Sequence, residues 1–86
     1  MPHPYEQELA LLEQLRALPS EPPENPQASQ LVERIVAILN QKCLQGDPRA
    51  KLAHKNAMVL REVVGTPYLK GWISVVRESF STRFSP

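Results

Sequence analysis

The chain has 86 residues, of which 42% are hydrophobic and 22% are charged, and its formal net charge is +1 at pH 7. That length allows one small domain, and the even charge balance provides no overall field that would gather nucleic acid or anionic lipid. The single cysteine excludes an internal disulfide, and the longest apolar run is far shorter than the ~20 residues that span a bilayer. Since the N-terminus also has no basic leader followed by an apolar core, we expect a cytoplasmic protein that does not enter a membrane.

Charge is distributed unevenly along the chain. Residues 1–46 contain six acidic and three basic side chains, whereas residues 47–86 contain three acidic and seven basic ones. The two halves therefore carry opposite net charges. They can attract one another, or the basic half can face an acidic partner.

The first predicted helix covers residues 4–18. Its apolar residues recur at helical spacing in two rows, Leu11–Leu15–Leu18 and Tyr5–Leu9–Leu12. Together the rows occupy about half of the helix circumference, which is wider than the stripe of an ordinary surface helix, so we expect contact with two neighbours. The two rows flank Glu8, and Glu6 and Glu8 both complement the positive end of the helix dipole. Three prolines then predict a linker over residues 19–25, because proline has no amide donor to continue a helix.

Three pairs of a capping residue and a proline predict the remaining helix starts: Asn25-Pro26, Asp47-Pro48 and Thr66-Pro67. Gly46 and Gly65 end the two intervening helices. The predicted helices cover residues 26–45, 48–64 and 67–82. The fold class is therefore all-α, a single domain over residues 1–86 with a three-helix core in 26–84. The first helix packs across that core or is exchanged between chains.

Three residues do not fit the simple apolar and polar pattern of these helices. Asn56 lies inside an apolar arc, so we expect its amide to bond to another helix, a cap or a symmetry mate. Gly71 lies in a helix interior, which indicates close approach of a neighbouring backbone or a local weakness. Lys42 falls near an apolar arc, and we expect it to extend towards the C-terminal carbonyls of its helix.

The sequence gives no pattern typical of catalysis or of a cofactor. One cysteine and two histidines do not make a structural zinc set, and the three glycines are isolated, so no phosphate-binding loop is present. Cys43 is expected on an apolar face near a helix C-terminus, where its pKa would be raised. We predict no enzyme activity, no cofactor and no metal.

Two helix faces are candidates for binding a partner. The third helix presents Met58 among basic side chains, and the fourth has aromatic and aliphatic residues over about half of its circumference. The candidate binding residues are Lys51, Lys55, Met58, Arg61, Tyr68, Trp72, Phe80 and Phe84. We predict a non-catalytic protein-interaction module, such as an adaptor, a regulatory subunit or a small inhibitor. Its partner is another protein, possibly an acidic one, or a second copy of this chain.

The alternative is a small helical regulator that binds DNA or RNA through the third and fourth helices, which have roughly the outline of a helix-turn-helix. The residues facing nucleic acid would be Lys70, Ser74, Arg77 and Ser81. Glu78 beside this row and the nearly neutral total charge argue against that reading. A continuous basic surface joining Lys51 and Lys55 to Lys70 and Arg77 would favour nucleic acid, whereas an apolar surface between them would favour protein.

Overall fold

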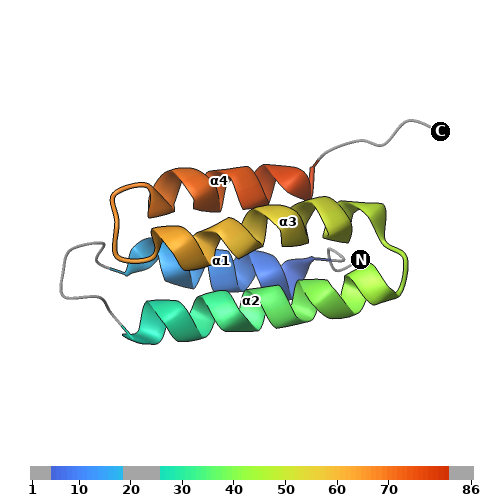
Figure 1. Cartoon of the computed structure of the whole chain (residues 1–86), viewed down its shortest axis with the longest axis horizontal. Helices are drawn as coiled ribbons and strands as arrows, with labels where there is room; N and C mark the ends of the chain where they lie inside the picture. The colour runs from blue at the N-terminus through green and yellow to red at the C-terminus, as the bar shows by residue number, and fades with distance from the viewer. Residues whose placement is uncertain (1–4, 19–25, 82–86) are drawn as a thin grey trace.

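The computed structural model describes residues 5–18 and 26–81. Four helices form within these ranges: α1 (Glu6–Ala17), α2 (Pro26–Leu44), α3 (Pro48–Val63) and α4 (Leu69–Ser79). Successive helices run in opposite directions and make an up-down-up-down bundle (Figure 1). α1 packs against α2 and α4, and α3 packs against the same two helices, so α1 and α3 are diagonally opposed. The prediction of a small all-α domain with four helices is confirmed.

The turn between α2 and α3 has the geometry that its sequence predicts. Gly46 has φ +88°, a left-handed conformation that glycine adopts without strain. Its amide donates to the Cys43 carbonyl at 2.9 Å, and the Asp47 amide donates to the Lys42 carbonyl at 3.2 Å. These two bonds define a Schellman motif, which satisfies carbonyls left open at the end of α2. The predicted end of the second helix at Gly46 is confirmed.

The start of α4 differs from the prediction. The Thr66 hydroxyl donates to the Val63 carbonyl at 2.6 Å and accepts from the Tyr68 amide at 3.3 Å. Thr66 therefore stabilises the turn after α3 instead of capping α4 directly. As a result α4 begins at Leu69, two residues later than expected. The predicted cap at Asn25 and the linker 19–25 lie outside the described residues.

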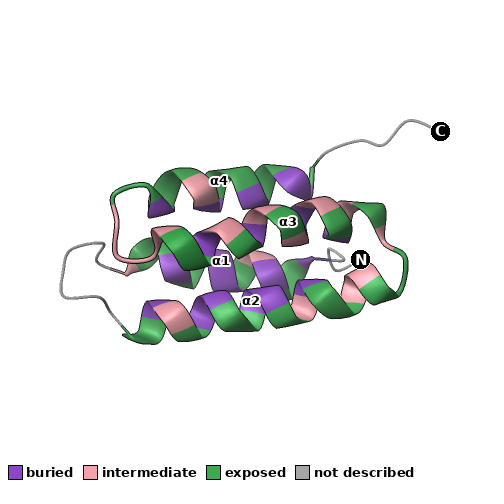
Figure 2. Cartoon of the chain, viewed as in Figure 1, coloured by how far each residue is buried: buried purple, intermediate pink, exposed green. Residues whose placement is uncertain are grey.

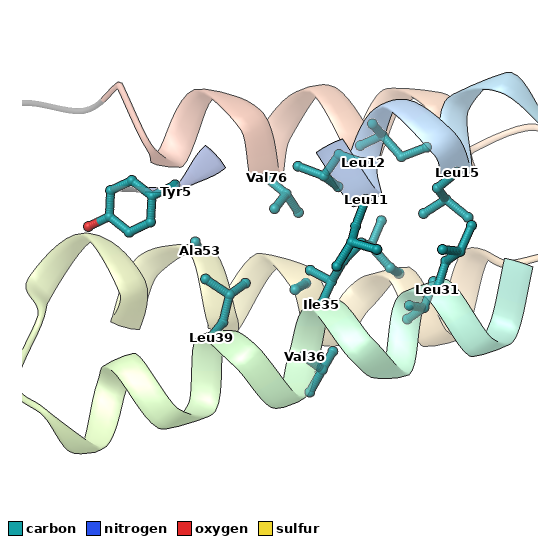
Figure 3. Packing of buried hydrophobic residues seen from close by; sticks show 14 of the residues in the cluster. Tyr5, Leu11, Leu12, Leu15, Leu31, Ile35, Val36, Leu39, Ala53 and Val76 are labelled. Carbon is teal, nitrogen blue, oxygen red and sulfur yellow. The ribbon is translucent and has the colours of Figure 1, made fainter. Parts of the chain in front are cut away.

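The core lies along the bundle axis and all four helices contribute to it (Figures 2 and 3). α1 and α2 contribute mainly large aliphatic side chains, among them Leu12, Leu15, Ile35 and Leu39. α3 instead contributes three alanines and one leucine that are all fully buried: Ala50, Ala53, Ala57 and Leu60. Small side chains allow helices to approach one another closely, so α3 occupies little core volume.

The beginning of α1 is bound to the bundle through Tyr5, whose side chain is 3% exposed. Its ring stacks on Phe80 at the end of α4, with 4.7 Å between the ring centroids. Its hydroxyl donates to Asp47 Oδ2 at the start of α3, at 2.5 Å. The Lys42 ammonium of α2 lies 4.8 Å from the centroid of the same ring. One side chain thus connects α1 to each of the other three helices.

An ion pair reinforces this end of the bundle. Glu8 is 0% exposed, and its Oε2 accepts from Lys42 Nζ at 2.6 Å. The other oxygen, Oε1, has no hydrogen-bond partner within the described part of the chain. Lys42 lies in the last turn of α2, where a cation is favoured, and the buried carboxylate of Glu8 holds its ammonium group. A buried charge needs such a partner, since leaving it unpaired costs several kcal/mol.

Replacing Lys42 alone should therefore destabilise the fold strongly. Lys42→Met leaves the Glu8 carboxylate buried without its cation, and we expect the free energy of unfolding to fall by about 3 kcal/mol. The double variant Glu8→Leu/Lys42→Met removes both charges and should recover most of that loss. Urea unfolding monitored by circular dichroism measures both values. Equal destabilisation by the single and double variants would contradict the importance of the pair.

Asp47 combines two structural roles. Its Oδ1 accepts from the amides of Arg49 at 3.0 Å and Ala50 at 3.3 Å, which caps α3, while Oδ2 binds Tyr5. Burial alone would raise the pKa of Asp47, but the hydrogen bonds from the Tyr5 hydroxyl and from the two amides outweigh it and lower the pKa. Burial and the neighbouring carboxylate raise the pKa of Tyr5, so its phenol remains a donor.

Stability should consequently decrease in acid partly through Asp47. An unfolded aspartate has a pKa of about 3.9, so below about pH 5 the unfolded chain binds more protons than the folded one and the free energy of unfolding decreases. Asp47→Asn keeps a cap acceptor and loses the charge, so its unfolding free energy should depend less on pH than that of the wild type. Asp47→Ala removes the cap as well and should cost about 1–2 kcal/mol at neutral pH. Parallel acid-dependence curves for the wild type and Asp47→Asn would contradict this role.

Candidate interaction surface

A polar contact marks the seam between α3 and α4. Asn56 Nδ2 donates to Ser79 Oγ at 2.8 Å, and the Ser79 hydroxyl donates to the Val75 carbonyl at 3.0 Å. The prediction that Asn56 bonds to another helix is confirmed. The contact also fixes the relative height of the two helices, because Asn56 of α3 lies opposite Ser79 of α4.

Apolar residues follow this seam on both helices. Positions three, four or seven residues from Asn56 share its stripe on α3, and the same spacing from Ser79 defines a stripe on α4. Tyr68 and Gly71 lie one turn before Trp72 and Val75 and continue the α4 stripe. Together with the apolar residues of the two stripes that are not fully buried, they form what we call the α3–α4 face: Leu52, Val59, Val63, Tyr68, Gly71, Trp72 and Val75. Each of these residues is exposed or half-buried, as the green and pink segments along α4 indicate (Figure 2).

Two aromatic side chains dominate the α3–α4 face. Tyr68 is 69% exposed, whereas Trp72 is half-buried and packs against the edge of the core. Val75 follows one turn after Trp72 and is 38% exposed. Of the four large apolar residues that are exposed in the described part of the chain, Tyr68 and Val75 both lie here. The face thus combines one aromatic side chain packed against the core, Trp72, with one that is open to solvent, Tyr68.

The predicted basic face of α3 is partly neutralised. Arg61 makes two bonds to Glu33 of α2, at 2.6 and 2.8 Å, and its Nη1 lies 3.3 Å from Met58 Sδ. Met58 and Arg61 therefore belong to the side of α3 that adjoins α2. Lys51 and Lys55 are exposed, and Lys55 borders the α3–α4 face because it lies one turn from both Leu52 and Val59.

Phe80 does not lie on a surface, contrary to its predicted role in binding. It is 2% exposed and stacks on Tyr5, so it belongs to the core. Its stacking partner comes from the opposite end of the sequence, and helical spacing within α4 alone could not show that α1 would cover it. Phe84, the proposed anchor in the tail, lies outside the described residues.

The residues of the nucleic-acid alternative follow a separate row on α4. Lys70, Ser74, Arg77 and Ser81 are all exposed, and Arg77 Nη1 lies 3.2 Å from Glu13 Oε1 of α1. The row thus faces the acidic helix α1, on the side of α4 away from α3. The α3–α4 face lies between this row and Lys55, so the described residues do not join the two basic groups into one surface.

The described residues give little geometry suited to bound ions or small ligands. No pocket and no group of three or more His, Cys, Asp or Glu side chains placed to hold a metal ion was found among them. Burial raises the pKa of the Cys43 thiol, in the direction that the sequence predicts. None of the described helices is both long enough and apolar enough to cross a membrane.

No protein family, no curated protein sequence and no solved structure matches the chain.

Substitution of Phe80 should lower the free energy of unfolding much more than substitution of Tyr68. Phe80→Ala removes a buried ring and its stacking on Tyr5, so the free energy of unfolding should fall by about 3 kcal/mol or more. Tyr68→Ala changes a side chain that is open to solvent and should alter stability by at most about 0.5 kcal/mol. Chemical denaturation of the two variants provides the comparison. Similar losses for both would contradict the placement of Tyr68 on an open surface.

Proposed function

We propose that this chain is a non-catalytic protein-interaction module that binds a partner protein through the α3–α4 face. In this role it acts as an adaptor, a regulatory subunit or a small inhibitor, by occupying a surface of its partner. The observation that carries the proposal is the 69% exposure of Tyr68 beside the half-buried Trp72 and the exposed Val75. Aromatic residues presented on a rigid element are typical of the centres of protein interfaces.

The surroundings of the α3–α4 face support a protein as its partner. Its apolar centre spans two helices that the Asn56–Ser79 contact holds together, so little ordering is needed on binding. Charged side chains, including Lys55 and Glu78, lie at its borders. An apolar centre with a charged rim is the usual arrangement of an interface between proteins.

Binding of DNA or RNA is less well supported. The basic row on α4 adjoins Glu13 of α1, and the ion pair with Arg77 reduces the charge that row offers to phosphates. Nucleic-acid surfaces need several cations acting together, because affinity grows with each neutralised phosphate. An apolar face between the two basic groups does not fit a phosphate backbone.

Affinity capture with matched variants tests the proposed function. The full chain and the variants Tyr68→Ser/Val75→Ser and Lys70→Ser/Arg77→Ser are each immobilised and exposed to extract from the native host. We expect specific proteins to be retained by the wild type and by the Lys70/Arg77 variant, and to be lost with the Tyr68/Val75 variant. Circular dichroism shows whether all three baits are equally folded.

The same experiment can favour the alternative. Retention that depends on Lys70 and Arg77, is indifferent to Tyr68 and Val75, and falls steeply with salt and after nuclease treatment would support nucleic acid and contradict the proposal. If neither double substitution changes retention, the partner does not bind through the α3–α4 face, and the proposal is contradicted.

A further inference from the structure

We infer that the α3–α4 face binds a second copy of this chain, about a two-fold axis parallel to the helices, so that α3 of each copy lies on α4 of the other. The inference rests on the proposed function, because it assigns a partner to the same face. Three features carry it: a glycine that the chain's own fold does not require, the matched heights of apolar residues on the two helices, and the signs of the charges at the borders.

Nothing in the described part of the chain requires a glycine at position 71. It lies inside α4, its φ is not positive, and a Cβ built on it would meet no atom within 4 Å apart from its chain neighbours and the adjacent backbone of its own helix. In a helix interior, glycine destabilises the helix more than any other residue except proline. Alanine would therefore give a more stable isolated bundle. Gly71 lies one turn from both Tyr68 and Val75, and it leaves a low point between those two exposed side chains. A helix from another molecule can approach closely at such a point.

The heights of residues along the bundle determine what can meet Gly71. Asn56 is bonded to Ser79, and α3 and α4 run in opposite directions, so each step forward on α3 corresponds to one step back on α4. Val63 is therefore level with position 72, one residue from Gly71 along α4. By the same count, Val59 is level with position 76, one residue from Val75.

A two-fold axis parallel to the helices keeps every residue at its own height while it places α3 of one copy over α4 of the other. Val63 of each copy then lies within one residue, about 1.5 Å, of the height of Gly71 of the second copy, where the missing side chain leaves room for it. Val59 lies within one residue of the height of Val75. The arrangement is isologous, so each contact occurs twice and the assembly closes as a dimer.

The charges at the borders of the face agree with this arrangement. Lys55 is exposed on α3, and Glu78 is exposed on α4 within about one turn of the same height. In the dimer, Lys55 of each copy faces Glu78 of the other, so unlike charges meet twice. Such exposed pairs contribute mainly to orientation and specificity. A strongly acidic partner would instead meet Glu62 and Glu78 on the borders of the face, which makes a second copy the better match.

Sedimentation velocity of the full chain over the micromolar range tests the inference, with Gly71→Ala as the decisive variant. We expect the wild type to form a dimer and Gly71→Ala to weaken dimerisation by about tenfold or more, because a methyl group fills the point of closest approach. In dilute samples, where the monomer predominates, the same variant should melt at a higher temperature, because alanine favours the helix. Ser74→Ala, on the outer side of α4, serves as the control and should leave dimerisation unchanged.

Charge exchange tests the orientation. Lys55→Glu and Glu78→Lys should each weaken the dimer, and the double variant should restore it, because the exchanged charges again face unlike partners. Failure of the double variant to recover would overturn the proposed axis.

Three other results would overturn the inference as a whole. These are a wild-type monomer at every concentration, a dimer that Gly71→Ala leaves intact, and a dilute Gly71→Ala variant that melts below the wild type. A monomeric chain that still retains host proteins through Tyr68 and Val75 would refute the second copy as partner and leave the proposed function standing.

Discussion

The attachment of α1 through Tyr5 and Glu8 is the contact on which the rest of the structure depends. Tyr5 touches α2, α3 and α4, and the buried carboxylate of Glu8 is held by Lys42. α1 thereby closes the opening between α2 and α4 and covers the apolar sides that both present to the bundle axis. Docking of α1 on the other helices costs conformational entropy. Without Tyr5 and Glu8, apolar contacts alone would have to offset that cost. Where α1 packs therefore decides which surfaces remain open.

The open surface lies on α3 and α4, on the outer side of the seam between them, which α1 does not cover. α3 turns its alanines to the core, and its larger residues Leu52, Val59 and Val63 lie along the seam with α4. α4 buries Leu69, Ile73, Val76 and Phe80, so its remaining aromatic side chains border the same seam. Two of the four large apolar residues that are exposed in the described chain, Tyr68 and Val75, thus lie together on this face, next to the half-buried Trp72. The packing of the core thus determines where apolar side chains stay exposed, and we propose that another protein binds there.

Local signals in the sequence predicted the helices well, because capping residues, prolines and glycines act through their own backbone, as Gly46 and Asp47 do. Helical spacing likewise identified Asn56 as a residue that needs a partner. The roles of Phe80, Lys42 and Glu8 could not be predicted, because they depend on contacts between residues far apart in the chain, such as Tyr5 with Phe80. The apolar arc of α4 was recognised, but dividing it into a buried part and an exposed part requires knowing which sides α1 and α3 cover.

The central claim is that another protein molecule covers the α3–α4 face when the chain functions, and Trp72, the only tryptophan, reports on that face directly. Its fluorescence and its quenching by acrylamide can be followed as the concentration of the chain rises and as a captured partner is added. The account predicts that emission moves to shorter wavelength and that quenching decreases as the face becomes covered. Emission and quenching that stay constant across all concentrations, and also with every bound partner, would contradict it.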